Sequence, residues 1–120
     1  MGYERHHAIL ITSWDDQIAA KAHAEATRLF DDIAPVTPVM YTSVNGYHSF
    51  AVLPDGSKEG WNHSKEGDEA RTDLIRWMNA QRYSDGSSPL DWAEVQYGDD
   101  NDVSVVTRHS DEPQYTDVIA

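Results

Sequence analysis

The chain contains no cysteine, which excludes disulfide bridges and metal sites built on thiolates. It also lacks an apolar run long enough to span a membrane, and residues 1–7 lack the apolar segment of a signal peptide. Positive charge is scarce, because nine lysines and arginines stand against 21 aspartates and glutamates. We therefore expect a cytoplasmic protein that binds neither nucleic acid nor an anionic membrane directly.

The net charge of −12 is unevenly distributed along the 120 residues. Residues 1–54 carry six acidic and three basic side chains, whereas residues 55–120 carry fifteen acidic and six basic ones. Charge of one sign opposes compaction through self-repulsion, so the excess calls for a reason. A basic partner, mimicry of nucleic acid and simple solubility each account for it at this stage.

The composition indicates one folded domain. Four tryptophans, six tyrosines and two phenylalanines supply bulky anchors, and 39% of the residues are hydrophobic, unlike an acidic disordered chain. We predict a single domain over residues 1–109. A polar tail over residues 110–120 follows, and we expect part of it to be disordered.

The first half of the chain predicts a strand, a helix and a hairpin. The apolar run at residues 8–11 predicts a buried strand over 6–12. Apolar residues at helical spacing predict a helix over 15–31: Ile18, Ala22, Ala26, Leu29 and Ile33. Asn45-Gly46 favours a tight turn with positive φ at both residues, joining strands over 39–44 and 47–53.

The second half repeats the pattern of helix and strand. Apolar residues at helical spacing predict a second helix over 68–82, and alternating residues predict a hairpin of strands 92–97 and 103–108. The resulting order is β-α-β-β-α-β-β. This order predicts an α+β fold in which an antiparallel sheet carries two helices on one face, a ferredoxin-like arrangement with an added strand.

Three acids fall on one face of the second helix and its approach. Glu66, Glu69 and Asp73 are about 4.5–6 Å apart along a helix axis, close to the phosphate spacing of a nucleic-acid strand. The simpler explanation is that acids near the start of a helix complement its dipole. Arg71 and Arg76 interrupt the row and weaken the case for a phosphate mimic.

A second acidic group, Asp99, Asp100 and Asp102, falls in the turn of the last hairpin. The spacing resembles that of a calcium loop, but Val105 stands where that loop needs glycine. We interpret the group as a solvated turn, or as a patch for a basic partner.

Histidine and the remaining aromatics offer weaker candidates. His48 and His63 flank the loop after the first hairpin, but no pair of histidines has zinc-helix spacing, so we expect no metal.

Two segments, Asp55-Gly56-Ser57 and Asp85-Gly86-Ser87, each precede a tryptophan. These turns either simply close loops or line one groove together with aromatic anchors, which are Tyr47, Trp61, Trp92 and Tyr97.

Four segments carry a likeness to known proteins: His7-Ala8-Ile9, Asn45-Gly46-Tyr47, residues 55–61 and residues 85–90. On these segments the chain resembles small acidic proteins encoded by bacteriophages. The resemblance implies a non-catalytic inhibitor that binds and blocks a host factor, commonly one of a defence system such as CRISPR.

The leading hypothesis is thus a phage-type inhibitor, with no cofactor, that binds a basic host protein at its nucleic-acid-binding site. We expect it to be a monomer or a homodimer. The candidate partner-binding residues are Glu66, Glu69, Asp73, Asp99, Asp100, Asp102, Trp61, Trp92 and Tyr97. The alternative is a protein that sequesters a signalling nucleotide through Tyr47, His48, Lys58, Trp61, Trp92 and Arg108. A metal-dependent hydrolase that uses His48 or His63 is a third hypothesis.

Overall fold

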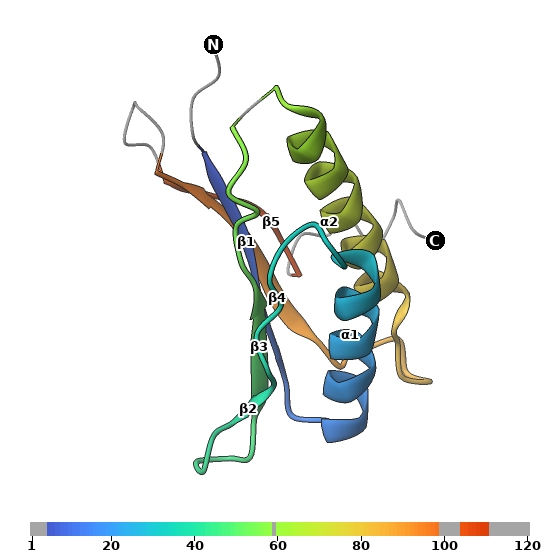
Figure 1. The fold of residues 1–120 in the computed structure, drawn as a ribbon. Coiled ribbons are helices and arrows are strands. Elements are labelled where there is room, and N and C mark those ends of the chain that lie inside the picture. The colour runs from blue at the N-terminus through green and yellow to red at the C-terminus, as the bar shows by residue number, and fades with distance from the viewer. Residues whose placement is uncertain (1–4, 59, 99–103, 111–120) are drawn as a thin grey trace.

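One antiparallel sheet and two helices make up the described part of the chain (Figure 1). The computed structural model describes residues 5–58, 60–98 and 104–110. The elements are β1 (His6–Ser13), α1 (Asp16–Leu29), β2 (Met40–Tyr41), β3 (His48–Val52), α2 (Asn62–Ala80), β4 (Asp91–Tyr97) and β5 (Val105–His109). The strands lie in the order β2-β3-β1-β4-β5.

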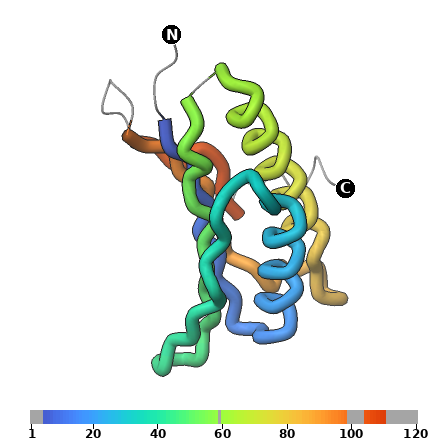
Figure 2. The backbone as a smooth tube through the Cα atoms, in the orientation of Figure 1, coloured from blue at the N-terminus to red at the C-terminus, as the bar shows by residue number. Residues whose placement is uncertain are grey.

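The prediction of the fold is confirmed. Each strand pairs antiparallel with its neighbour, and β1 is the central strand between β3 and β4. Both helices cover the same face of the sheet, side by side and antiparallel to each other (Figure 2). The first four strands have the ferredoxin-like order, and β5 adds a strand beside β4.

Helix α1 begins one residue later than predicted because Asp15 caps it. The Asp15 Oδ1 accepts hydrogen bonds from the backbone N–H groups of Gln17 at 3.0 Å and Ile18 at 3.2 Å. The helix ends at Leu29 rather than 31, since Asp32 adopts a left-handed φ of 61° that no helix can include.

Helix α2 begins at Asn62, whereas the sequence predicted a start at residue 68. Gly67 lies inside this helix, where the chain passes close to the loop after β3. A Cβ atom at Gly67 would lie 2.5 Å from the Asp55 Oδ2 and 3.2 Å from the Arg71 Nη1. Glycine is required there for close approach, so it does not mark the end of a helix.

The hairpin between β2 and β3 has the predicted turn but shorter strands than expected. Asn45 and Gly46 both have positive φ, at 62° and 66°. Strand β2 ends at Tyr41. In the turn beyond it, the Thr42 N–H donates to the Tyr47 carbonyl oxygen at 2.8 Å, and the Thr42 hydroxyl accepts from the N–H of Tyr47 at 3.0 Å. The last strand begins at Val105 among the described residues, and the start predicted at 103 lies outside them.

The core lies between the sheet and the two helices. Every second residue of β1, β3 and β4 points into it, and small residues of α1 let that helix approach closely. Its largest members are Ile9, Ile11, Phe30, Phe50, Leu74, Met78 and Trp92. Neither helix has the length and apolarity needed to cross a bilayer, as judged on the described residues.

Candidate functional site

The acidic row of α2 is exposed to solvent. Glu66, Glu69 and Asp73 are all exposed. Because α2 begins at Asn62, they lie in its second turn and beyond, and the first turn of the helix contains no acid. The helix dipole acts within the first turn, so it does not explain these three carboxylates.

Among the described residues, only Asp73 of these three acids forms an ion pair. Asp73 lies 3.7 Å from the guanidinium of Arg76, and both side chains are more than half exposed. Glu66 and Glu69 have no ion pair within the part of the chain that the structure describes. Exposed pairs of this kind contribute about 0–1 kcal/mol, so the row adds little to stability.

The end of α1 extends the acidic surface. His63, in the first turn of α2, lies 2.9 Å from the carbonyl oxygen of Ile33 through its Nε2. This contact brings the exposed Asp31 and Asp32 beside the start of α2. Sequence reasoning missed these two acids because they follow α1 and sit far from α2 along the chain.

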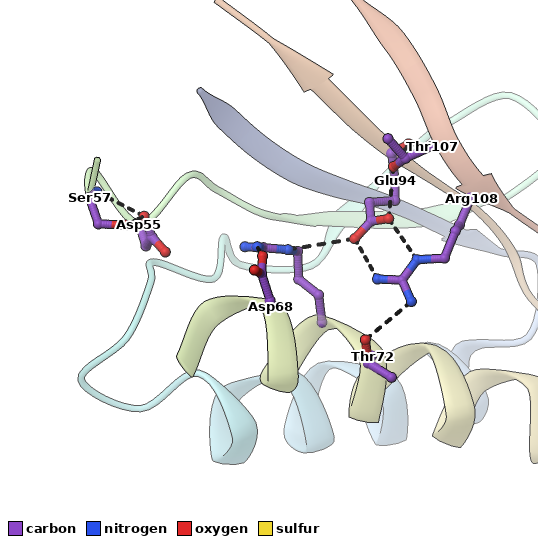
Figure 3. Close-up of polar contacts among 8 residues, drawn as sticks. Asp55, Ser57, Asp68, Thr72, Glu94, Thr107 and Arg108 are labelled. Carbon is purple, nitrogen blue, oxygen red and sulfur yellow. Dashed lines mark hydrogen bonds and ion pairs between the residues drawn. The ribbon is translucent and has the colours of Figure 1, made fainter. Parts of the chain in front are cut away.

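A buried charged cluster fastens the same helix to the sheet (Figure 3). Glu94 is 4% exposed, and its carboxylate accepts from the Arg108 Nε at 2.7 Å and Nη2 at 2.9 Å. The guanidinium of Arg71, 3% exposed, lies 3.5 Å from the other side of that carboxylate and also pairs with Asp68. Arg108 donates to the Thr72 hydroxyl at 3.2 Å.

The carboxylate of Glu94 stays ionised inside the protein. Burial raises its pKa, but hydrogen bonds from Arg108 and Thr107 and the charges of both arginines outweigh burial and hold the pKa below its ordinary value. The cluster therefore joins α2, β4 and β5 by charge-assisted hydrogen bonds.

Two interpretations made from sequence are corrected by this cluster. Arg71 does not interrupt the exposed acidic row, because its side chain points inward to Glu94. Arg108 was a candidate ligand for a nucleotide phosphate, yet its guanidinium is already held by Glu94. The signal that could have found the pair is the inward position of Glu94, two residues after the buried Trp92 on one strand.

The aromatic residues predicted to bind a partner separate into exposed and buried ones. Trp61 is 53% exposed and is the N-cap residue of α2, at the start of the acidic row. Tyr97 is 38% exposed at the end of β4, where its ring lies 5.3 Å from that of His6. Trp92 is 4% exposed and packs in the core opposite Ile11, so its ring cannot reach a partner.

The residues proposed for nucleotide binding do not come together. Tyr47 and His48 lie at the start of β3, whereas Lys58 and Trp61 follow its other end (Figure 1). Of the two Asp-Gly-Ser turns, the first lies beside Gly67 in the second turn of α2, and the second follows the C-terminal end of that helix, about 20 Å away along its axis. In both turns the serine N–H and hydroxyl donate to the aspartate Oδ1, so each turn closes its own loop.

The histidines are likewise dispersed. His23 contacts the carbonyl oxygen of Thr37 at 3.0 Å, and the ring of His48 lies against that of Tyr41 at 5.2 Å. His6 and His109 face opposite ends of β4 and do not meet. Across residues 5–58, 60–98 and 104–110, no three metal-ligating side chains converge. The acidic group Asp99, Asp100 and Asp102 lies outside the described residues.

Comparison with known proteins identifies no family. No family model and no curated protein matches the sequence. A double mutant of the guanylyl cyclase domain of the RhoGC fusion protein, from the aquatic fungus Blastocladiella emersonii, is similar in structure at a TM-score of 0.37 and 7% identity. The match covers 81% of this chain and 60% of that one.

Proposed function

We propose that this chain is a non-catalytic binding protein whose acidic α2 surface engages a basic protein. The acidic α2 surface consists of Glu66, Glu69 and Asp73 together with Trp61 at the start of the helix. One observation carries the proposal: the three acids are exposed beyond the first turn, where neither the helix dipole nor a network of ion pairs accounts for them.

The chemistry of this surface suits recognition of a basic partner. Carboxylates spaced about 4.5–6 Å along one helix present a regular negative field, and such a field steers a basic protein and speeds its association. Trp61, 53% exposed, adds an apolar anchor of the type that carries binding energy at protein interfaces.

The identity of the partner class rests on the resemblance to phage proteins. We propose that the partner is a defence factor in the cytoplasm of a bacterial host. The basic surface that it presents would be its nucleic-acid-binding site, because such sites gather lysine and arginine. The three acids of the α2 row extend over the length of only a few phosphates. They therefore support an inhibitor that competes with nucleic acid for part of that basic surface, rather than a protein that mimics a whole duplex.

Affinity capture from a bacterial host lysate tests this function. The immobilised wild-type chain should retain a basic, nucleic-acid-binding protein. An α2 triple variant (Glu66→Gln, Glu69→Gln and Asp73→Asn) should retain much less of it, because the steering charge is removed while side chains of the same size and similar helix propensity remain.

A second triple variant provides the matched control. Asp16→Asn, Asp85→Asn and Asp91→Asn remove the same charge from exposed positions at the first residue of α1, in the loop after α2 and at the first residue of β4. These segments lie at the end of the molecule opposite the start of α2 (Figure 1). This control variant should retain the partner as the wild type does. Equal retention by all three proteins, or capture of an acidic partner alone, would show that α2 is not the binding surface.

A further inference from the structure

The face of the sheet that the helices leave uncovered alternates between large and small side chains. On the central strand, Leu10 is 55% exposed, and its register partners on either side are Ala51 of β3 and Ala93 of β4. Further out, Met40 of β2 is 64% exposed and Val106 of β5 is 55% exposed. Leu10 therefore forms a short apolar ridge between two troughs floored by Ala51 and Ala93, and Met40 and Val106 add apolar side chains on the outer strands in neighbouring rows of the register.

The troughs are open hollows on both sides of Leu10. One has a volume of about 540 Å³ and is lined by Leu10, Ala93 and Val106 among others. The other has a volume of about 380 Å³ and is lined by Leu10, Met40 and Ala51 among others. A surface with this relief can receive a large side chain on either side of Leu10, about one strand spacing of 4.8 Å away from it.

This face also lacks the charge that marks the rest of the protein. Among the described residues that the strand register places on it, Asp91 is the only carboxylate, although the whole chain carries −12. A basic partner finds no row of acids here. A second copy, by contrast, brings only its own Asp91 to this face within the part of the chain that the structure describes.

We propose that two copies of this chain pack these open sheet faces together, the Leu10 ridge of each copy seated in an alanine trough of the other. Such contacts are reciprocal under two-fold symmetry, because each copy carries both ridge and trough. The five strands contain 27 residues in total, or about 90 Å of strand, which gives a face of roughly 440 Å², so that two faces bury about 900 Å². That area is below the usual size of a stable interface, so we expect a weak dimer that forms at micromolar or higher concentrations.

The dimer would leave both acidic α2 surfaces free. The helices and the open face lie on opposite sides of the sheet, so the two helix layers would point outward (Figure 1). The two interfaces should also respond to salt in opposite ways. Screening weakens the attraction of α2 for a basic partner, but it relieves the repulsion between two copies that each carry −12.

Sedimentation equilibrium of the full chain, from about 1 to 500 µM and at low and high salt, tests the dimer. The wild type should dimerise, and more tightly at high salt. Leu10→Asp should weaken dimerisation by about 100-fold or more, because each substitution is made twice and two tenfold losses multiply. Val44→Asp adds the same charge at a 73% exposed position in the hairpin turn and should dimerise as the wild type does.

Two further variants keep the outcomes distinct. Val106→Asp, on the edge strand β5, should also weaken the dimer. It replaces Leu10→Asp in the test if circular dichroism shows that Leu10→Asp is unfolded. The α2 triple variant should still dimerise, so loss of partner binding and loss of dimerisation are separable. A wild type that stays monomeric throughout, or a dimer that folded Leu10→Asp and Val106→Asp leave unchanged, would overturn the proposal.

Discussion

At the scale of single residues, the buried carboxylate of Glu94 organises the side of α2 opposite the acidic row. It accepts hydrogen bonds from Arg108 and Thr107 and lies 3.5 Å from the Arg71 guanidinium while only 4% exposed. A buried ion pair adds little over apolar packing, but breaking one leaves an uncompensated charge. Glu94 thus affects stability mainly because it supplies the counter-charge for two arginines.

Replacing Glu94 should therefore lower the stability of the protein. Glu94→Gln should lower the free energy of unfolding by about 3 kcal/mol, since Arg71 and Arg108 lose their shared counter-charge inside the protein. Urea denaturation measures the change. The exposed Glu69→Gln serves as control and should stay within about 0.5 kcal/mol of the wild type. Equal stability of both variants would mean that the cluster is not important for folding.

The pH dependence of stability follows from the same residue. The pKa of Glu94 is lowered in the folded protein, so its contribution is fully present above the ordinary pKa, about 4.5, and is lost as pH falls through the folded value. The stability difference between the wild type and Glu94→Gln should therefore shrink below about pH 4.5. A difference that is constant from pH 7 to pH 3 would contradict the lowered pKa.

At the scale of elements, Gly67 shows how α2 is placed against the loop after β3. Glycine inside a helix usually costs about 0.5–1 kcal/mol relative to alanine. Here a Cβ would meet the Asp55 Oδ2 at 2.5 Å, and Asp55 is held by two hydrogen bonds from Ser57. The contact cannot relax without breaking that turn.

Gly67→Ala should therefore destabilise the protein by about 1 kcal/mol instead of stabilising it. In an Asp55→Ala background the contact at 2.5 Å is gone and only the one with the Arg71 Nη1 at 3.2 Å remains, so the same substitution should destabilise the protein less than it does in the wild type. Thermal or urea unfolding of the four proteins in this double-mutant cycle measures the coupling. Additive effects would show that Asp55 does not constrain the helix.

Sequence patterns predicted elements better than their bounds. The apolar spacing of α1 and the Asn45-Gly46 turn depend on local chemistry, and both were confirmed. The start of α2 was wrong because the demand for glycine at residue 67 comes from Asp55, a contact made only in three dimensions. The partners of Glu94 were missed for the same reason, since Arg71 and Arg108 reach it from other elements.

At the scale of the whole molecule, the two sides of the sheet differ in chemistry. The helix side carries the acidic α2 surface with Asp31 and Asp32, and the open side is apolar and nearly free of charge within the described strands. A negative net charge of this size keeps copies apart in solution. Gathering acids on the helix side leaves the open face able to form contacts that the charge would otherwise oppose.

The central claim is that the acidic α2 surface steers a basic partner into contact. Its most direct test is the association rate of the captured partner with the immobilised chain, measured at several ionic strengths. The wild type and the control triple variant should show a rate that falls steeply with salt. The α2 triple variant should associate about tenfold more slowly at low salt and respond weakly to it. Rates and salt dependence that match across the three proteins would contradict the account.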